Sequence, residues 1–184
     1  MSRRPDHVAR ALSEPVELSE YDPEWPALFE AEADALHAIL PPESTGRIEH
    51  IGSTAVPGLA AKPIIDILIE TPSLQRVQEE IAPILTARGY EFFWRPGPDA
   101  LAWFIKRDEA GARTHHIHFM TPGRGFQDRI SFRDHLRTNP AAARAYAELK
   151  RKAAAAHGND RRAYAAAKTD FIRKALRDAG KRGL

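Results

Sequence analysis

The sequence predicts an α+β fold, in which a mixed, mostly antiparallel β-sheet has helices packed on one face and further helices follow at the C-terminal end. Short apolar runs of β-branched and aromatic residues alternate with helical patterns over the first two thirds of the chain, and helical segments fill the rest. With 184 residues, 43% of them hydrophobic, the chain is long enough to bury a core of its own. We therefore expect one domain over residues 1–184, of which residues 1–13 form a loose, charged lead-in.

The strands are expected where apolar residues alternate or run together between turn residues. The predicted ranges are 16–19 as a short edge strand, 47–51, 64–70, 90–95, 101–107 and 113–120. The segment TPGRGFQD at 121–128 is expected to be a turn-rich connector.

The helices are expected where apolar residues recur every three or four positions and capping residues stand at the ends. Asp22 is predicted to cap the first helix, with Pro23 at its first helical position, and Ser73 is predicted to cap the second. Pro83 should kink that second helix and Gly89 should end it. The C-terminal helices are expected over 127–138, 141–157 and 161–179.

Composition excludes several classes of protein. The chain has no cysteine, which excludes disulfides, zinc–thiolate sites and thiol nucleophiles. No apolar run is long enough to span a bilayer and no hydrophobic signal core is seen, so we expect no membrane partner and a cytoplasmic location. A net charge of +2 does not indicate a nucleic-acid partner. The sequence gives no indication of the oligomeric state.

The segment IEHIGSTAVPGLAAKPIIDILI carries the first candidate site residues. Gly52 permits close approach of a ligand or backbone, and Ser53 and Thr54 offer hydroxyl and N–H groups to an anion. Lys62 is a candidate for neutralising a phosphate or, alternatively, a solvated lysine before a strand. Asp66 lies inside an apolar run, where a carboxylate needs a partner, a metal or a cleft. A structural carboxylate that accepts backbone N–H bonds is the alternative for Asp66.

Strand alternation places Asp66 with two histidines. In 64–70 the odd-numbered isoleucines share one face and Asp66 lies on the other, and in 114–120 His116 and His118 lie opposite Ile117 and Phe119. If the apolar faces of both strands point the same way, Asp66, His116 and His118 converge. Two imidazoles and one carboxylate suit a single transition metal better than magnesium. Ordinary half-exposed strand histidines are the alternative.

Basic residues at four-residue spacing form a third set of candidates. Arg133 and Arg137 share a helix face and are candidates for clamping an anion, unless they form a surface face paired with Asp134. The pairs Tyr146–Lys150 and Tyr164–Lys168 repeat this spacing. For these pairs the sequence favours packing, with the ring in the core and the ammonium at its rim, and contact with a ligand is the alternative.

The chain resembles the nucleotidyltransferase superfamily of polymerase beta type, whose signature is a Gly-Ser turn followed by a strand bearing paired carboxylates. The closer resemblance is to the GrpB family and covers most of the chain. It is carried, in order, by YDPEWPALFE at 21–30, EHIGSTAVPGLAAKPIIDI at 49–67, HHIHF at 115–119, FRDHLR at 132–137, YAELK at 146–150 and YAAAKTDFI at 164–172.

The resemblance implies a nucleotidyltransferase-like sheet and a protein that binds a nucleotide or a phosphorylated small molecule, with nucleotidyl transfer to an acceptor as the implied reaction. Ser53 would hold the phosphates, Lys62 or Arg133 would neutralise charge, and Asp66 would hold a divalent metal. Leu68 stands where these enzymes carry the second carboxylate. We therefore expect one zinc or manganese ion rather than a magnesium pair.

Two other functions stay open. One is a non-catalytic module that binds a nucleotide or a coenzyme A-related ligand, because members of the family occur fused to dephospho-coenzyme A kinase. The other is a metal-dependent hydrolase that uses Asp66, His116 and His118. Leu68 distinguishes the transferase from both alternatives, because a transferase would carry a carboxylate there. The two histidines distinguish the hydrolase from the binding module, because only the hydrolase would use them.

Overall fold

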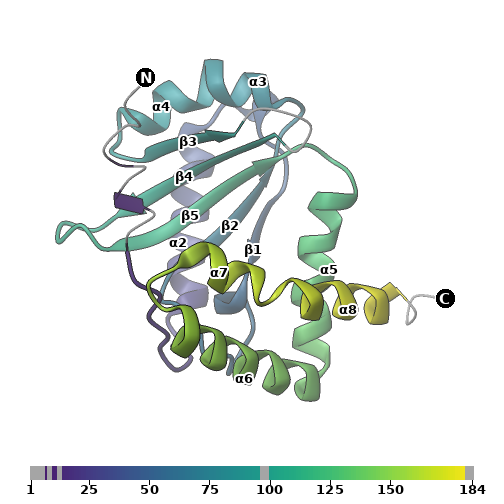
Figure 1. Ribbon diagram of the computed structural model, residues 1–184. Helices are drawn as coiled ribbons and strands as arrows, with labels where there is room; N and C mark the ends of the chain where they lie inside the picture. Colours follow the sequence, from purple (N-terminus) through teal and green to yellow (C-terminus); the bar gives the residue numbers. More distant parts are fainter. Residues whose placement is uncertain (1–6, 8–9, 12–13, 96–99, 181–184) are drawn as a thin grey trace.

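Five strands form one mixed sheet in the computed structural model, which describes residues 7, 10–11, 14–95 and 100–180. The sheet order is β1-β2-β5-β4-β3; β2 and β5 are parallel and the other neighbours are antiparallel (Figure 1). The strands are β1 (Ile48–Ile51), β2 (Ile65–Glu70), β3 (Glu91–Arg95), β4 (Leu101–Arg107) and β5 (Arg113–Met120). This confirms the α+β prediction, with β5 at the centre of the sheet.

The predicted strands agree with the observed ones to within one residue at each end, except at the N-terminal edge. The expected strand at 16–19 is reduced to a single bridge between Ser19 and Ala61. Most of the expected lead-in, residues 1–13, lies outside the described residues. Within it, Ala11 is buried against Phe93 and Ile105, so this part of the lead-in is packed rather than loose.

The helices fall into an N-terminal and a C-terminal group. They are α2 (Trp25–Ile39), the 3₁₀ turns η1 (Pro42–Ser44) and η2 (Ser53–Ala55), α3 (Leu74–Arg76), the π-helical turn η3 (Val77–Ile81), α4 (Ala82–Thr86), α5 (Arg124–Thr138), α6 (Pro140–His157), α7 (Arg161–Ala166) and α8 (Thr169–Gly180). Ser73 caps α3 by accepting a hydrogen bond from the N–H of Gln75, as predicted. Gly89 follows α4 with a φ of 85°.

Four predictions about the helices and their connections need correction. The first helix begins at Trp25, because Asp22 accepts a bond from the N–H of Glu24 at 2.9 Å and so forms a turn ahead of the helix instead of capping it. The connector at 121–128 already becomes helix at Arg124, and the expected helix over 161–179 is divided into α7 and α8. The distortion expected at Pro83 lies in the preceding turn η3, where widened π geometry accommodates the missing N–H.

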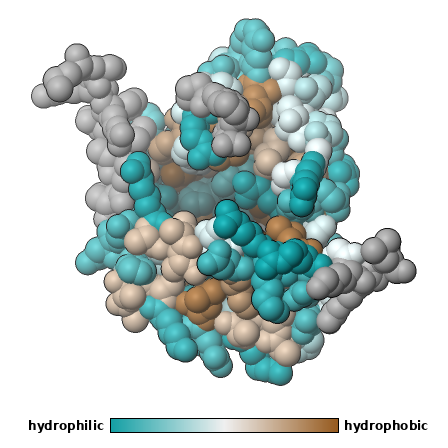
Figure 2. Space-filling model, turned by 45° about the vertical axis from the view of Figure 1, so that its right-hand side comes forward, coloured by the Kyte–Doolittle hydropathy of each residue, from teal (hydrophilic) through white to brown (hydrophobic). Residues whose placement is uncertain are grey.

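The two faces of the sheet are covered by different helices. Figure 1 shows α2 behind the sheet, and the odd-numbered isoleucines of β2 pack there in the main core with α2 and the η3–α4 segment. The opposite face is covered at its β1–β2 edge, where Ile51 and Leu68 pack against Phe126 and Ile130 of α5. A hollow lies between the strands and the C-terminal helices (Figure 2). None of the described helices has the length and hydropathy that a membrane span requires.

Candidate functional site

Asp66, His116 and His118 converge on the face of the sheet opposite the main core. Asp66 pairs in register with His116, and Leu68 with His118, across the parallel strands β2 and β5. The Asp66 Oδ1 atom lies 3.3 Å from His116 Nδ1 and 3.5 Å from His118 Nε2, and one ligand atom from each residue falls within 4.8 Å of the others. The prediction that the three side chains share one face is confirmed, whereas their role as metal ligands stays a prediction.

The protonation states of Asp66 and His116 suit a cation. Burial by itself would raise the pKa of Asp66, but hydrogen bonds from His116 and His118 outweigh it and hold that pKa well below its ordinary value. Burial lowers the pKa of His116 to about 4, so its imidazole is neutral at physiological pH. Two ligands of one tetrahedral metal lie about 3.4 Å apart when each bond is about 2.1 Å. The separations of 3.3 and 3.5 Å from Asp66 Oδ1 match that spacing.

Gly52 provides the space that the Asp66 carboxylate occupies. It has a φ of 73°, and a Cβ atom built on it would lie 2.5 Å from Asp66 Oδ2. A larger residue would therefore be strained in its backbone and would also collide with the carboxylate. The glycine of the Gly-Ser turn is explained by the position of Asp66.

Leu68 is a core residue. Its side chain is fully buried against Ile51, Phe126 and Ile130, on the same face as Asp66. The only other carboxylate of β2, Glu70, accepts a hydrogen bond from Arg47 at 3.0 Å at the end of the strand. Strand β2 therefore contributes a single carboxylate to the cluster.

A small pocket of about 140 Å³ lies beside Asp66 and joins the Gly-Ser turn to the C-terminal helices. We call it the lysine pocket. Its lining includes Gly52, Ser53, Thr54, Lys62, Asp66, Tyr146, Lys150, Tyr164 and Lys168. The structure thus brings four of the predicted residues, Gly52, Ser53, Thr54 and Lys62, together with Asp66. It adds two lysines that the sequence analysis had assigned to packing.

Burial lowers the pKa of each lysine in this pocket. The pKa falls to about 7 for Lys150 and to about 8 for Lys168, and it is also lowered for Lys62. The nearby ammonium groups add to the effect of burial, because like charges disfavour one another. Lys150 is 2% exposed and donates a hydrogen bond to the carbonyl of Ala60, so the expectation that its ammonium lies at the rim of the core was wrong.

The two tyrosines support the lysines. The Lys168 ammonium lies 4.2 Å from the centre of the Tyr164 ring, and the Lys150 ammonium lies 5.1 Å from that of Tyr146. The repeated Tyr-x-x-x-Lys spacing, within α6 and from α7 into the turn after it, therefore pairs each ring with an ammonium group above it. This spacing was the signal from which both lysines could have been assigned to the site.

The turn itself is fixed by a buried histidine. His50 Nε2 lies 3.0 Å from Thr54 Oγ1, and its ring stacks on Phe29 with a centroid distance of 4.7 Å. Burial is the largest cause that lowers the pKa of His50, to about 4, so the ring stays neutral. In β1, Glu49 is therefore the residue next to His50 that shares the face of Asp66.

Arg133 and Arg137 lie on a different surface from the lysine pocket. Arg133 binds Glu49 at 2.7 Å and the His50 carbonyl at 2.9 Å, and Arg137 donates to the Ala55 carbonyl at 2.8 Å. Both line a larger groove of about 880 Å³ between α2, β1 and α6, which we call the outer groove. Neither arginine lines the lysine pocket, so the structure does not bring them to the phosphates expected at Ser53.

A family model described as GrpB protein matches residues 15–178. The chain belongs to the GrpB family. Curated relatives include the UPF0157 protein PA4798 of Pseudomonas aeruginosa, 42% identical over 88% of this chain, and the UPF0157 protein YqkA of Bacillus subtilis, 36% identical over 89%. The chain spans 66% of the first relative and 47% of the second.

Two further matches bear on family and fold. The protein named dephospho-CoA kinase in Mycolicibacterium paratuberculosis is 33% identical over 94% of this chain, which covers 47% of that relative. The crystal structure of GrpB from Enterococcus faecalis matches with a TM-score of 0.77 and 37% identity, over 90% of this chain and 98% of that one. Structures of Cid1 match at a TM-score of 0.46 and 13% identity, a likeness too weak to inform the chemistry of the site.

Proposed function

We propose that this GrpB-family protein binds the phosphate groups of a nucleotide or another phosphorylated small molecule in the lysine pocket, next to a single divalent metal ion at Asp66. The observation that supports the proposal best is the lysine pocket itself, where three ammonium groups and a Gly-Ser turn meet one carboxylate. Buried ammonium groups need anionic partners, and Asp66 is the one carboxylate among the described residues lining the pocket. A phosphate group supplies the missing negative charge.

The size of the pocket limits what enters it. Its volume of about 140 Å³ is well below the roughly 300–1,000 Å³ of a pocket that encloses a drug-sized ligand. Phosphate groups fit this space, whereas the rest of a nucleotide would lie outside it. The hollow between the strands and the C-terminal helices is open for that remainder (Figure 2).

The cluster of Asp66, His116 and His118 fits one divalent transition metal. It offers one ionised carboxylate and two imidazoles, and burial keeps His116 neutral. Leu68 blocks the position from which β2 would supply a second carboxylate, so a magnesium pair does not fit this strand. A bound metal would supply Lewis-acid polarisation of a phosphate oxygen.

The residues around the two sites then have separate roles. Lys62, Lys150 and Lys168 bind and neutralise the phosphates, and Ser53 orients them from the turn. Gly52 lets the Asp66 carboxylate approach the turn, and His50 holds Thr54. Transfer of a nucleotidyl group to an acceptor is the reaction that the family resemblance implies for this arrangement, and zinc or manganese is the metal that its ligands favour.

A coenzyme A-related ligand is the second candidate, supported by the relative named dephospho-CoA kinase. That ligand also carries phosphate groups, so the lysine pocket would serve it without nucleotidyl transfer. No observation on the described residues or in the comparisons favours a metal-dependent hydrolase.

Calorimetric titration with tripolyphosphate and ATP tests the phosphate part of the proposal. We expect binding to the wild type and a loss of about tenfold in affinity, ~1.4 kcal/mol, for each of Lys150→Met and Lys168→Met. Lys152→Met is the matched control, because Lys152 lies on α6, as Lys150 does, but is exposed. Wild-type protein that binds neither compound, or equal affinities in all three variants, would contradict the lysine pocket as the phosphate site.

Titration with zinc, manganese and magnesium tests the metal part. We expect one zinc or manganese ion per chain, lost in Asp66→Ala, His116→Ala and His118→Ala, and retained in His157→Ala, which changes an exposed histidine. Two magnesium ions per chain, or zinc affinity that survives the loss of both strand histidines, would show that the single-metal site is wrong. Dephospho-coenzyme A as a third phosphate ligand distinguishes the second candidate from the first.

A further inference from the structure

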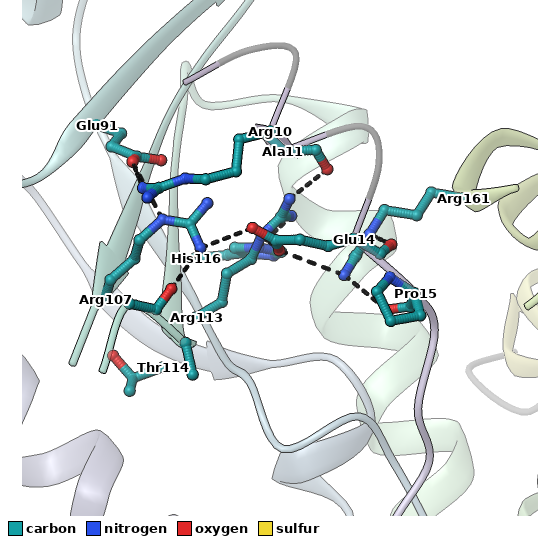
Figure 3. Close-up of polar contacts among 12 residues, drawn as sticks. Arg10, Ala11, Glu14, Pro15, Glu91, Arg107, Arg113, Thr114, His116 and Arg161 are labelled. Atoms are coloured by element: carbon teal, nitrogen blue, oxygen red, sulfur yellow. Dashed lines mark hydrogen bonds and ion pairs between the residues drawn. The ribbon is translucent and has the colours of Figure 1, made fainter. Parts of the chain in front are cut away.

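Three arginines surround the carboxylate of Glu14 (Figure 3). They lie on the side of His116 that faces away from Asp66. Arg107 Nη1 lies 2.7 Å from Glu14 Oε1, Arg113 Nε contacts Oε2, and Arg161 Nη2 lies 3.7 Å from Oε2. We call Arg107, Arg113 and Arg161 the arginine cluster. These residues come from the neighbouring ends of β4 and β5 and from the start of α7, so the β4–β5 hairpin and a C-terminal helix meet at one side chain.

The arginine cluster carries more positive charge than its partners neutralise. The side chains of Arg113, Arg107 and Arg161 are only 6%, 9% and 15% exposed. Glu91 is the second carboxylate there, and it is shared between Arg107 and Arg10. Among the described residues, the three guanidinium groups of the arginine cluster therefore meet two carboxylates, one of which also binds Arg10, and Arg107 Nη2 is buried without a hydrogen-bond partner.

Such an excess is unfavourable in a buried place unless an additional anion compensates for it. Burial, followed by the charge of Arg161, lowers the pKa of Arg113 to about 10, so the cluster stays protonated at physiological pH. Arginine also presents a planar fork of donors that matches phosphate oxygens better than a lysine does. The arrangement therefore suits an anion with more charge and more acceptor oxygens than one carboxylate.

The arginine cluster adjoins the candidate metal site. Arg113 Nη1 lies 3.5 Å from His116 Nε2, while Nδ1 of the same ring faces Asp66 at 3.3 Å. Arg161 begins α7, whose Tyr164 lines the lysine pocket. The imidazole of His116 thus lies between Arg113 of the arginine cluster and the Asp66 carboxylate, which lines the lysine pocket.

We propose that Arg107, Arg113 and Arg161 form a second anion site for a phosphate group, and that the Glu14 carboxylate occupies this site until such a ligand displaces it. The inference rests on the proposed function for the class of ligand, a phosphorylated molecule, but it concerns different residues. A purely structural role for Glu14 is the competing explanation, because Arg161 also binds the carbonyls of Glu14 and Pro15 at 2.8 and 3.1 Å.

The test is the effect of Glu14→Gln on tripolyphosphate affinity, measured by calorimetry in the wild-type protein and in the Lys150→Met/Lys168→Met variant. Removing the resident carboxylate should tighten binding about tenfold in both proteins, since the ligand no longer competes with it. Adding Arg161→Gln should abolish that gain. Glu20→Gln is the matched control, because it removes an exposed Glu–Arg pair that also involves the N-terminal part of the chain.

Two further measurements keep the inference falsifiable if Glu14→Gln folds poorly. The melting temperature of Glu14→Gln should rise more on adding phosphate than that of the wild type, because phosphate takes the place of the lost carboxylate. In the wild-type background, Arg161→Gln alone should weaken tripolyphosphate binding about threefold, and Arg162→Gln, at an exposed neighbour, should leave it unchanged.

The outcomes separate this inference from the proposed function. If Glu14→Gln leaves tripolyphosphate affinity unchanged or weakens it, Glu14 is a structural partner of the arginines and the inference is overturned, whatever the lysine variants do. If the lysine variants bind as the wild type does but Glu14→Gln still tightens binding, the arginine cluster is an anion site and the lysine pocket is not.

Discussion

The lysine pocket and the arginine cluster lie on either side of the Asp66–His116–His118 group, and they handle buried positive charge in different ways. The lysine pocket contains Lys62, Lys150 and Lys168 with little negative charge from the chain, and the pKa values of its lysines fall. The arginine cluster is paired with Glu14 and keeps its charge. The first region can relieve its excess charge by releasing protons, whereas the second requires a resident carboxylate.

The difference follows from the chemistry of the two side chains. A lysine ammonium titrates when it is buried, but a guanidinium stays protonated and has to be neutralised by an anion. The lysine pocket should therefore be sensitive to pH, and the arginine cluster should be sensitive to the loss of its carboxylate. Three substitutions test this contrast, in order of decreasing effect on the free energy of unfolding.

The largest effect is expected for Gly52→Ala, which displaces the Asp66 carboxylate that the surrounding cations share. The variant should lose about 3 kcal/mol of unfolding free energy, since it combines an unfavourable φ with a Cβ placed 2.5 Å from Asp66 Oδ2. Urea unfolding followed by circular dichroism measures it. Gly58→Ala is the matched control, because Gly58 has nearly the same φ, 74°, with nothing within 4 Å of a Cβ.

Gly58→Ala should cost about 1 kcal/mol, the backbone part of the effect alone. Equal losses in the two variants would mean that close packing against Asp66 does not explain the glycine at position 52.

A smaller loss is expected for Glu14→Gln in a buffer without phosphate. It leaves buried guanidinium groups with less negative charge, and we expect the free energy of unfolding to fall by about 2 kcal/mol. The same urea measurement applies. Glu20→Gln should change this quantity by less than about 0.5 kcal/mol, because the Glu20–Arg151 pair is exposed. A Glu14→Gln variant as stable as the wild type would show that the arginine cluster does not need its carboxylate.

The smallest effect, of opposite sign, is expected for Lys150→Met. The folded pKa of about 7 lies below the ordinary 10.5, so between these values the unfolded chain binds more protons and stability rises with pH. At about pH 6 both states are protonated, and the wild type bears the full cost of the buried charge. At this pH the free energy of unfolding of Lys150→Met should exceed that of the wild type by about 1 kcal/mol, and this excess should disappear by about pH 9.

Urea unfolding at both pH values checks this prediction. For Lys152→Met, at an exposed position of the same helix, the difference in unfolding free energy from the wild type should not change with pH. A destabilised Lys150→Met variant at about pH 6 would mean that the hydrogen bond to the Ala60 carbonyl outweighs the buried charge.

The strand part of the candidate site could be predicted because strand alternation is a local property. Once β2 and β5 were located, a period of two was enough to place Asp66, His116 and His118 on one face, and the parallel register then brought them together. The sheet boundaries were found for the same reason. Leu68, by contrast, stood out as a departure from paired carboxylates only because of the family resemblance.

The remaining contacts depend on how distant segments pack, and the sequence does not contain that information locally. The Tyr-x-x-x-Lys spacing was visible, but whether Lys150 on α6 and Lys168 after α7 point to solvent or into a pocket depends on where these helices dock. Arg133 and Arg137 share a helix face as predicted, yet that face lines the outer groove. No local pattern connects Glu14 to arginines that lie about a hundred positions away or more.

The parallel pairing of β2 with β5 has a consequence for the order in which the molecule folds. β3, β4 and β5 form a local antiparallel meander and β1 pairs with β2 nearby, but β2 and β5 are separated by a long stretch of chain. Closing that loop costs more conformational entropy than forming either hairpin, so pairing of β2 with β5 should be a late step. Asp66, His116 and His118 therefore come together only when the two halves of the sheet join. A metal ion present during folding would affect that final step alone.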